Sequence, residues 1–455
     1  MPFHDRIREC MMTQSGSQRR GPFSRRDFLR ASSLSAGALL TGCAIDPVTG
    51  RGKLSLMSQS QEIGVDRQHS PQQFSADYGA VQDGGLNRYV AGVGRKLGAL
   101  SHRPEMPYSF RVVNATYINA YAFPGGSIAA TRGIMLNLEN EAELAGLLGH
   151  ELGHVNAQHT AEQMTKGILT NAVLSGVTRV AASRGQAWGQ VTSALGQVGA
   201  GALLARYSRS NEHEADALGL EYMVKGGYNP DGFVGLMDLL NSLNKHKSSA
   251  IEMMFATHPM SSERYSRAVS NAKGQYAGHG DLPLGRQRYM DETASLRRIK
   301  GAIEAMQNGE KAMGQKKYGD AEGQFQTALR QAPHDYTANV LMAKCLVTQE
   351  KYDGALGYAE KAKGVYPQEA QGHLLAGFVK VKKQQFGSAY QDFVTYDRVL
   401  PGNAAVTFFK GRSLEGMGKR QGAAQDYQKY LQVVNKGDMA KHAYQRLVEW
   451  GYVKR

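Results

Sequence analysis

The chain has 455 residues, more than one ordinary hydrophobic core accommodates, so two to three domains are expected. Its hydrophobic content of 42% and charged content of 21% are typical of a globular protein, and the absence of 18 consecutive apolar residues argues against a membrane-spanning helix. The formal net charge is +14, of which the first 42 residues carry +4. A basic surface favours anionic lipid or nucleic acid, but no nucleic-acid motif accompanies it, so we expect no nucleic-acid partner.

Residues 1–42 predict a signal peptide. An arginine pair with Phe and Leu after it lies in Ser24–Arg30, a weakly apolar stretch follows, and Leu40-Thr41-Gly42-Cys43 ends the segment. Charge, an apolar region and then small residues is the order found in export signals. The arginine pair resembles a twin-arginine signal, with general secretion as the alternative.

The end of this segment resembles a lipoprotein box. That resemblance implies cleavage before Cys43 and a diacylglycerol on its sulfur. Ala44 follows instead of Asp, which by analogy favours the outer membrane, so we expect a periplasmic protein held there by a lipid anchor. Because Cys10 would then be removed and Cys43 capped, Cys345 would be the remaining thiol, and no internal disulfide is expected.

The next part of the chain predicts a tether, then helices and a small sheet. Residues 43–58 predict an extended, lipidated tether, and residues 59 to about 100 are mostly helical. Tyr108–Asn114 has the alternation of a strand. Ile118–Phe123, then Pro-Gly-Gly, then Ser127–Thr131 predict a strand, a turn and a second strand.

A helix is predicted to begin after Asn140. Asn140 can cap its first amides, Glu143 stands where a capping box needs an acid, and apolar residues recur at helical spacing up to Val155. Residues 167–205 are rich in Gly, Ala, Ser and Thr, which predicts either a pliant helical lid or helices packed through small side chains. Another helix is expected from about Asn211 to Val224.

His150 and His154 lie four residues apart on the first of these helices. Their imidazoles therefore share one helix face and can bind a single metal ion. Glu151 lies about 100° around the helix, where it can reach a water without being a ligand. A metzincin would need His at position 160, but Thr160 is there, and His159 is one residue early. The third ligand must therefore come from elsewhere.

The acidic segment Glu212-His213-Glu214-Ala215-Asp216 can supply that ligand. Glu212 and Asp216 are one helical turn apart. A carboxylate can bind zinc, and a second acid can hold the other nitrogen of a ligating imidazole. The residue types alone leave Glu212 and Glu214 both available, while His213 is expected at the surface.

Together these two segments resemble the BepA/HtpX-type zinc metallopeptidases, which are related to the CAAX prenyl proteases. That group shows Glu-x-x-x-Asp after its zinc helix. Asn119–Gly126 resembles its edge-strand motif, with Tyr121 where Phe is usual, and His258–Arg264 resembles its His-Pro-x4-Arg motif. The tether Asp46–Gly50 also resembles lipoprotein members. The likeness covers about residues 44–275.

The resemblance implies a set of residue roles. Zinc would be held by His150, His154 and Glu212, with Glu214 left as a solvated or packing acid. Glu151 would be the general base toward a zinc-bound water, and Asp216 a supporting catalytic acid. The substrate would pair along the strand Ala120, Tyr121, Ala122 and Phe123.

The resemblance also bears on the His-Pro segment. In BepA-type members the matching histidine can occupy the fourth zinc position and block it. His258 is therefore a candidate fourth ligand and latch, or else a cap beside Pro259. Arg264 could orient the site, steady an oxyanion, or form a structural ion pair.

From about residue 301 the chain repeats with a period of 34. Small residues, aromatic residues and prolines each recur in step. The recurring positions are Gly309, Ala343, Gly377 and Gly411; Ala321, Ala355, Ala389 and Ala423; Phe325, Ala359, Phe393 and Tyr427; Tyr318, Tyr352 and Phe386; and Pro333, Pro367 and Pro401. This pattern resembles the tetratricopeptide repeat, in which small residues let two helices approach and proline ends the second helix.

We therefore expect an α+β architecture. A mostly helical, zincin-like domain with a small sheet (residues 59–275) would be joined by a linker (276–300) to an all-α tetratricopeptide solenoid (301–455). The expected function is a zinc endopeptidase for unfolded or misassembled envelope proteins, whose repeats dock substrates or the outer-membrane assembly machinery. The alternatives are a scaffold or chaperone with a latched zinc site and, more weakly, a prenyl-protein protease.

Overall fold

The computed structural model describes most of the chain, namely residues 43–45, 47–50, 52–54, 57–163, 206–246 and 249–453. The predicted signal peptide and the predicted lid at 167–205 lie outside the described residues. None of the helices within the described ranges combines the length and apolar character that crossing a bilayer requires. The predicted tether is more than an extended segment, because β1 (Cys43–Ile45) and β2 (Gly52–Leu54) pair as an antiparallel hairpin.

The first helices are followed by a three-stranded mixed sheet. α2 (Gln59–Ala76) and α3 (Gly84–Gly98) precede it, as the mostly helical prediction requires. β3 (Ser109–Val113) runs parallel to the central β5 (Ser127–Thr131), and β4 (Ala120–Ala122) runs antiparallel on the other side of β5. The predicted edge strand is therefore an edge of the sheet.

The central helix of this domain is α5 (Glu141–Asn156), which follows the short α4 (Arg132–Met135). Asn140 caps α5 by accepting from the N–H of Glu143 at 2.9 Å. Glu143 accepts from the N–H of Glu139 instead of from that of Asn140, so the cap differs from the predicted capping box. Every residue of α5 is buried, so its polar side chains need partners inside the domain.

Further helices complete the domain and fill the predicted linker. Two short 3-10 turns lie among them. Tyr289, in the predicted linker, is fully buried and donates from its hydroxyl to the carbonyl of Met135 at 2.7 Å, so this segment packs on the domain. The elements are α9 (Arg209–Lys225), α10 (Asp231–His246), η1 (Ser249–Ile251), α11 (Glu252–Thr257), α12 (Ser262–Lys273), η2 (Ala277–His279), α13 (Arg286–Glu292) and α14 (Ala294–Arg298).

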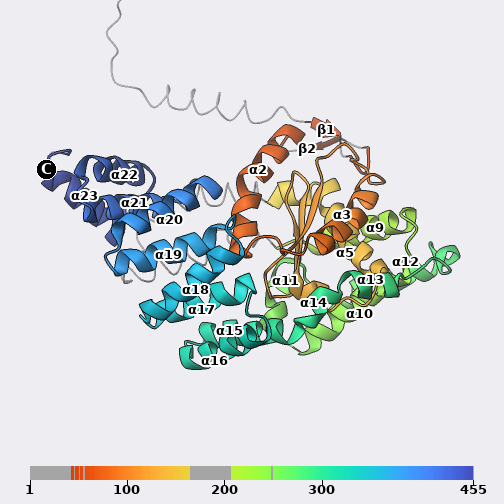
Figure 1. The fold of residues 1–455 in the computed structure, drawn as a ribbon. Coiled ribbons are helices and arrows are strands. Elements are labelled where there is room, and N and C mark those ends of the chain that lie inside the picture. Colours follow the sequence, from red (N-terminus) through yellow and green to blue (C-terminus); the bar gives the residue numbers. More distant parts are fainter. Residues whose placement is uncertain are drawn as a thin grey trace, which may run out of the picture. The chain divides into compact units, whose positions relative to one another are not determined.

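The C-terminal part is an array of helix pairs that follow one another along the chain (Figure 1). The second helices begin 34 residues apart, which confirms the predicted period. α23 begins 34 residues after α21 and is therefore the first helix of a fifth, incomplete unit. The array contains α15 (Lys300–Gly314), α16 (Tyr318–Gln331), α17 (Tyr336–Thr348), α18 (Tyr352–Val365), α19 (Ala370–Lys382), α20 (Phe386–Val399), α21 (Ala404–Gly416), α22 (Arg420–Val433) and α23 (Asp438–Glu449).

Small and aromatic residues meet inside each pair. A Cβ built on Gly377 would lie 2.8 Å from the ring of Phe393, and one on Gly411 would lie 2.8 Å from the ring of Tyr427. In the second repeat the equivalent residues are Ala343 and Ala359, both fully buried. An aromatic ring on the second helix is thus paired with glycine on the first helix, and alanine is paired with alanine. The expected α+β domain followed by a tetratricopeptide solenoid is confirmed.

The array packs on the sheet domain through polar, buried contacts. Arg132 donates to both oxygens of Asp335, at 2.6 and 3.4 Å. Glu310 accepts a hydrogen bond from Thr116, and Glu369 accepts one from Ser75. Because such groups tolerate burial only when paired, these contacts specify how the two regions meet.

Candidate metal centre

Two helices meet backbone to backbone at the site. A Cβ on Gly149 would lie 2.8 Å from the carbonyl oxygen of Gly219, and one on Gly153 would lie 2.8 Å from that of Ala215. Any side chain at these positions would push α5 and α9 apart. The glycines therefore bring the face of α5 that carries the two histidines against the face of α9 that carries Glu212.

Four side chains converge there: His150, His154, Glu212 and His258. The Nε2 atoms of the two α5 histidines are 3.1 Å apart, and Nε2 of His154 lies 3.4 Å from Oε1 of Glu212. His258 follows α11 and places Nδ1 3.0 Å from Oε1 of Glu212 and 3.4 Å from Nε2 of His150. All four residues are buried.

This donor set fits zinc. Ligands of a tetrahedral zinc ion with bonds of 2.0–2.2 Å are about 3.3–3.5 Å from one another. Five of the six separations between the four side chains run from 3.0 to 3.7 Å, and all four ligand atoms lie within 4.8 Å of one another. Three imidazole nitrogens and one carboxylate oxygen are also ligand types that zinc prefers. Burial lowers the pKa of His154 well below its ordinary value, which favours the neutral ring that a metal needs.

On the side away from the cluster, the imidazole of His150 contacts Asp216, which in turn binds the guanidinium of Arg264. Its Nδ1 atom lies 2.9 Å from Oδ1 of Asp216, one turn after Glu212 on α9. Arg264 of α12 donates to both oxygens of Asp216, at 2.7 and 2.8 Å, and pairs with Glu212 as well. Burial would raise the pKa of Asp216, but the charge of Arg264 outweighs it and the pKa is lowered. Asp216 and Arg264 thus orient the imidazole and keep the acids ionised.

Sequence reasoning missed two residues around His154. Nδ1 of His154 lies 3.1 Å from Nδ1 of His159, whose Nε2 is 3.2 Å from Oε2 of Glu214. Tyr207 stacks on His154 with ring centroids 3.8 Å apart. The spacing of His159 does not suit a metzincin, and the family resemblance implies that Glu214 is a solvated or packing acid. His213 lies outside the cluster, with Nε2 3.5 Å from Oε1 of Glu263.

Glu151 has a different environment from the other acids of the site. It is 1% exposed, and neither carboxylate oxygen has a hydrogen-bond partner among the residues that the structure describes. Burial raises its pKa above the ordinary value. Nε2 of His258 lies 3.8 Å from Oε1 of Glu151, an ion pair only when that histidine is protonated. A buried carboxylate that lies beside a metal-ligand cluster and accepts no hydrogen bond is suited to accept a proton.

The edge strand β4 pairs with β5 on one side only. The carbonyl of Asn119 accepts from the N–H of Thr131, and the N–H of Phe123 donates to the carbonyl of Ser127. Since strand residues alternate in direction, Tyr121 also turns toward β5, while Ala120 and Ala122 turn their N–H and C=O groups outward. Ala120 and Ala122 are fully buried, so these outward groups do not face solvent in the structure.

The fold and this donor set define a domain of the zinc metallopeptidase class. Residues 85–272 match the model of peptidase family M48, and residues 312–377 match that of the tetratricopeptide repeat. The chain therefore carries a peptidase family M48 domain followed by tetratricopeptide repeats.

Curated relatives match part of the chain. Metalloprotease YcaL of Escherichia coli (strain K12) is 29% identical over 239 residues, which are 50% of this chain and 91% of that protein. The beta-barrel assembly-enhancing protease of Yersinia pestis is 28% identical over 259 residues, 54% of this chain and 51% of that protein. Metalloprotease LoiP of Escherichia coli (strain K12) is 32% identical over 160 residues, 35% of this chain and 60% of that protein. The chain spans about half the length of the assembly-enhancing relatives that it matches.

Proposed function

We propose that this chain is a zinc-dependent endopeptidase that hydrolyses peptide bonds of unfolded or misassembled envelope proteins. The observation that carries the proposal is Glu151, a buried carboxylate without a hydrogen-bond partner among the described residues, set beside the His150, His154 and Glu212 cluster. A purely structural metal site would have no use for an acid buried without hydrogen bonds, which costs free energy of folding.

The residues of the chain divide the work of hydrolysis. When bound, zinc supplies the Lewis acidity that polarises a carbonyl and makes water nucleophilic near neutral pH. Glu151 takes the proton of the attacking water on a carboxylate oxygen and passes it to the leaving amine. Asp216, itself held by Arg264, keeps Nδ1 of His150 protonated so that Nε2 faces the metal.

A substrate would add to the sheet as an extended strand. Ala120 and Ala122 turn backbone groups away from β5, to which a substrate strand would bond once the groups that bury them move aside, and Tyr121 and Phe123 complete the segment that the substrate would follow. Pairing of this kind reads backbone more than side chain. Proteins with unpaired strands, such as unfolded or misassembled ones, are therefore the class of substrate that fits.

Replacing Glu151 tests the proposed chemistry. Glu151→Gln keeps size and removes the proton acceptor, so hydrolysis of an unfolded protein such as casein should fall by about 10²–10⁴-fold while bound zinc is retained. Glu221→Gln, at an exposed ion pair with Lys225, is the matched control and should leave both unchanged. Wild-type rates in Glu151→Gln would contradict the mechanism. The inactive variant can also trap substrates in the native envelope for mass spectrometry.

We also propose where the protein acts and with which partners. The export signal in residues 1–42 and lipidation of Cys43 would place it in the periplasm, anchored to the outer membrane. The repeats would dock substrates or the outer-membrane protein assembly machinery, in line with the names of the assembly-enhancing relatives. Cys43→Ser should move the protein from the membrane to the soluble envelope fraction. Unchanged membrane retention would refute the anchor.

A second candidate function is a scaffold or chaperone whose zinc site rests shut. It is favoured by His258, which is 4% exposed and lies within 3.4 Å of two proposed ligands. Four protein ligands are typical of structural zinc, and catalysis needs one position open. His258→Ala should therefore raise hydrolysis of casein if the histidine is a latch. His213→Ala, outside the cluster, is the control. A wild type that is already fast, and unchanged by His258→Ala, removes the latch.

A further inference from the structure

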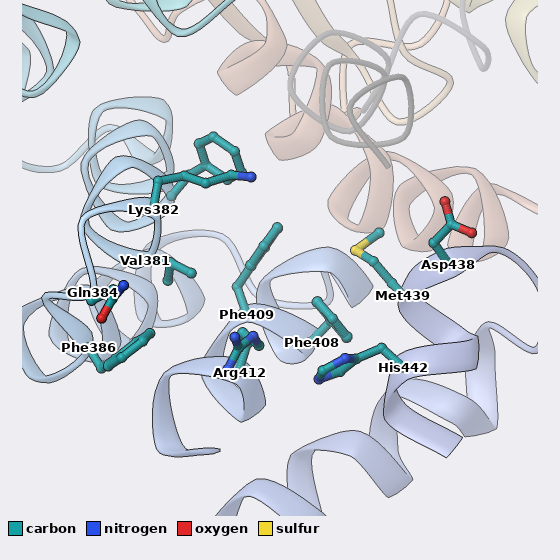
Figure 2. Close-up of a pocket in the computed structure, with 11 residues that line it drawn as sticks. Val381, Lys382, Gln384, Phe386, Phe408, Phe409, Arg412, Asp438, Met439 and His442 are labelled. Carbon is teal, nitrogen blue, oxygen red and sulfur yellow. The ribbon is translucent and has the colours of Figure 1, made fainter. Parts of the chain in front are cut away.

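The C-terminal end of the array contains a cavity of about 700 Å³. Its walls come from α19, α21 and α23, the first helices of three successive repeats, and Figure 2 shows Phe409 rising between Val381 on one side and Phe408 on the other. The apolar lining consists chiefly of Phe378, Val381, Phe408, Phe409 and Met439. A hollow of this size, lined by aromatic and aliphatic groups, is large enough to take side chains of a bound ligand.

The cavity lies on the face of the array that, in the first repeats, packs on the peptidase domain. Glu310, Lys344, Phe378 and Arg412 occupy the same repeat position, 34 residues apart. In the first two repeats this position contacts the peptidase domain, since Glu310 accepts from Thr116 and Lys344 lies 4.7 Å from the ring centroid of Tyr78. In the next two repeats Phe378 and Arg412 line the cavity instead. The same face thus binds protein at one end and is hollow at the other.

The positive charge around the cavity favours a partner that carries negative charge. Residues 370–455 hold fourteen Lys and Arg against six Asp and Glu, a net charge of +8. Lys382 and Arg412 line the cavity, and Arg412 lies 5.9 Å from the ring centroid of Phe386. Asp438 is the single carboxylate among the lining residues, and it begins α23, where the helix dipole offsets its charge.

Glu415, the acid next to Arg412, pairs with other cationic groups as well. Glu415 is 3.5 Å from Arg412, but it also binds His442 at 2.9 Å and Arg446 at 2.7 Å. Glu415 is therefore shared among Arg412, His442 and Arg446, of which Arg446 also pairs with Glu449 at 2.6 Å. A further negative charge brought by a ligand would be attracted to this rim.

We propose that this cavity binds a segment of a partner protein in which an aromatic side chain is flanked by acidic residues. The aromatic group fills the hollow between α19, α21 and α23, and the acids pair with Lys382 and Arg412. This inference rests on the partner-docking role proposed for the array and gives that role a chemistry. An anionic membrane surface fits less well, because a flat headgroup layer does not fill a concave aromatic pocket.

Fluorescence polarisation on the full chain tests the proposal. The probe is a labelled twelve-residue peptide with one Phe among Asp and Glu residues, compared with its Phe-to-Ala analogue. The background is Glu151→Gln, so that binding is read without cleavage. The Ala analogue and the variants Lys382→Glu and Arg412→Glu should each bind about tenfold or more weakly. Unchanged thermal melting shows that the variants are folded.

Exposed cations outside the cavity provide the matched control. Lys419→Glu and Arg420→Glu make the same charge change, and affinity within about twofold of the parent is expected because they do not touch the pocket. Equal binding of the Ala analogue, equal loss in the control variants, or binding to anionic phospholipid vesicles but not to the peptide would each overturn the proposal. A wild-type chain that binds the peptide but does not hydrolyse casein would overturn only the proposed enzyme activity.

Discussion

Glycine has opposite uses in the two regions of this protein. Between α5 and α9, Gly153 faces the backbone of Ala215, so two main chains touch and the ligands on both helices converge. In the array, Gly377 faces the ring of Phe393, so the glycine makes room for a side chain. A Cβ added against main chain can be accommodated only if the two helices move apart. A Cβ added against a ring can be accommodated by a smaller side chain in place of the ring. The metal centre should therefore be intolerant at its glycines, and the array adjustable.

Among the changes that test this comparison, the largest effect is expected from Gly153→Ala. Its Cβ would meet the backbone of α9 and displace Glu212 from the two histidines. Zinc affinity should fall by about 10–100-fold, the range seen when ligand support is lost, as measured by competition with a chromophoric chelator. Gly146→Ala on the same helix is the control, because its Cβ faces the side chain of Phe233 at 3.1 Å. Equal zinc affinity in both variants would show that the backbone contact does not position the ligands.

A smaller effect is expected from Gly377→Ala in the array. Overpacking against Phe393 should cost about 1–3 kcal/mol in the free energy of unfolding, measured by urea denaturation. Combined with Phe393→Ala it should cost less than the sum of the two single changes, because Ala343 and Ala359 already form such a pair. Gly357→Ala, where nothing lies within 4 Å, should instead stabilise. Additive costs in the double variant would refute the idea of matched volumes.

The smallest effect concerns the contact between the two regions. Burial raises the pKa of Glu310, which accepts from Thr116 across that contact. A carboxyl whose pKa is raised in the folded state favours folding at low pH, and that contribution is lost as pH rises through the raised pKa. Wild type should therefore lose stability relative to Glu310→Gln as pH rises above 4.5, the ordinary pKa of the group. The loss should be about 1.4 kcal/mol for each pH unit that separates the ordinary pKa from the raised one.

Urea denaturation across this pH range measures the difference, and Glu304→Gln, exposed on the same helix, is the control. A difference between wild type and Glu310→Gln that does not change with pH would contradict the role assigned to burial. A pH dependence of the same size in Glu304→Gln would point to the net charge of the helix instead.

Local patterns predicted much of the fold and of the metal centre. The four-residue spacing of His150 and His154 and the 34-residue period are properties of single helices and repeats, which the sequence carries directly. His159 could not be found in this way. α5 ends at Asn156, and Gln158 then adopts a left-handed backbone with φ 61°, which turns His159 back onto His154. Helical periodicity does not extend across such a turn.

Long-range contacts were equally hidden from the sequence. Arg132 and Asp335 are 203 residues apart and pair only because the array packs on the sheet domain. The same holds for Tyr207, whose ring stacks on His154 from a separate segment. Residues 276–300 were predicted to be a linker between the domains, whereas Tyr289 within them is buried. In each case the partner lies outside the window in which residue spacing carries information.

Zinc binding by the purified, exported form is the most direct measurement. One zinc ion per chain is expected, with affinity lowered by about 100-fold or more in His150→Ala, His154→Ala and Glu212→Gln, since each removes one of three proposed ligands. A wild-type protein that binds no zinc would contradict a metal centre at this site. So would variants that hold zinc as tightly as the parent.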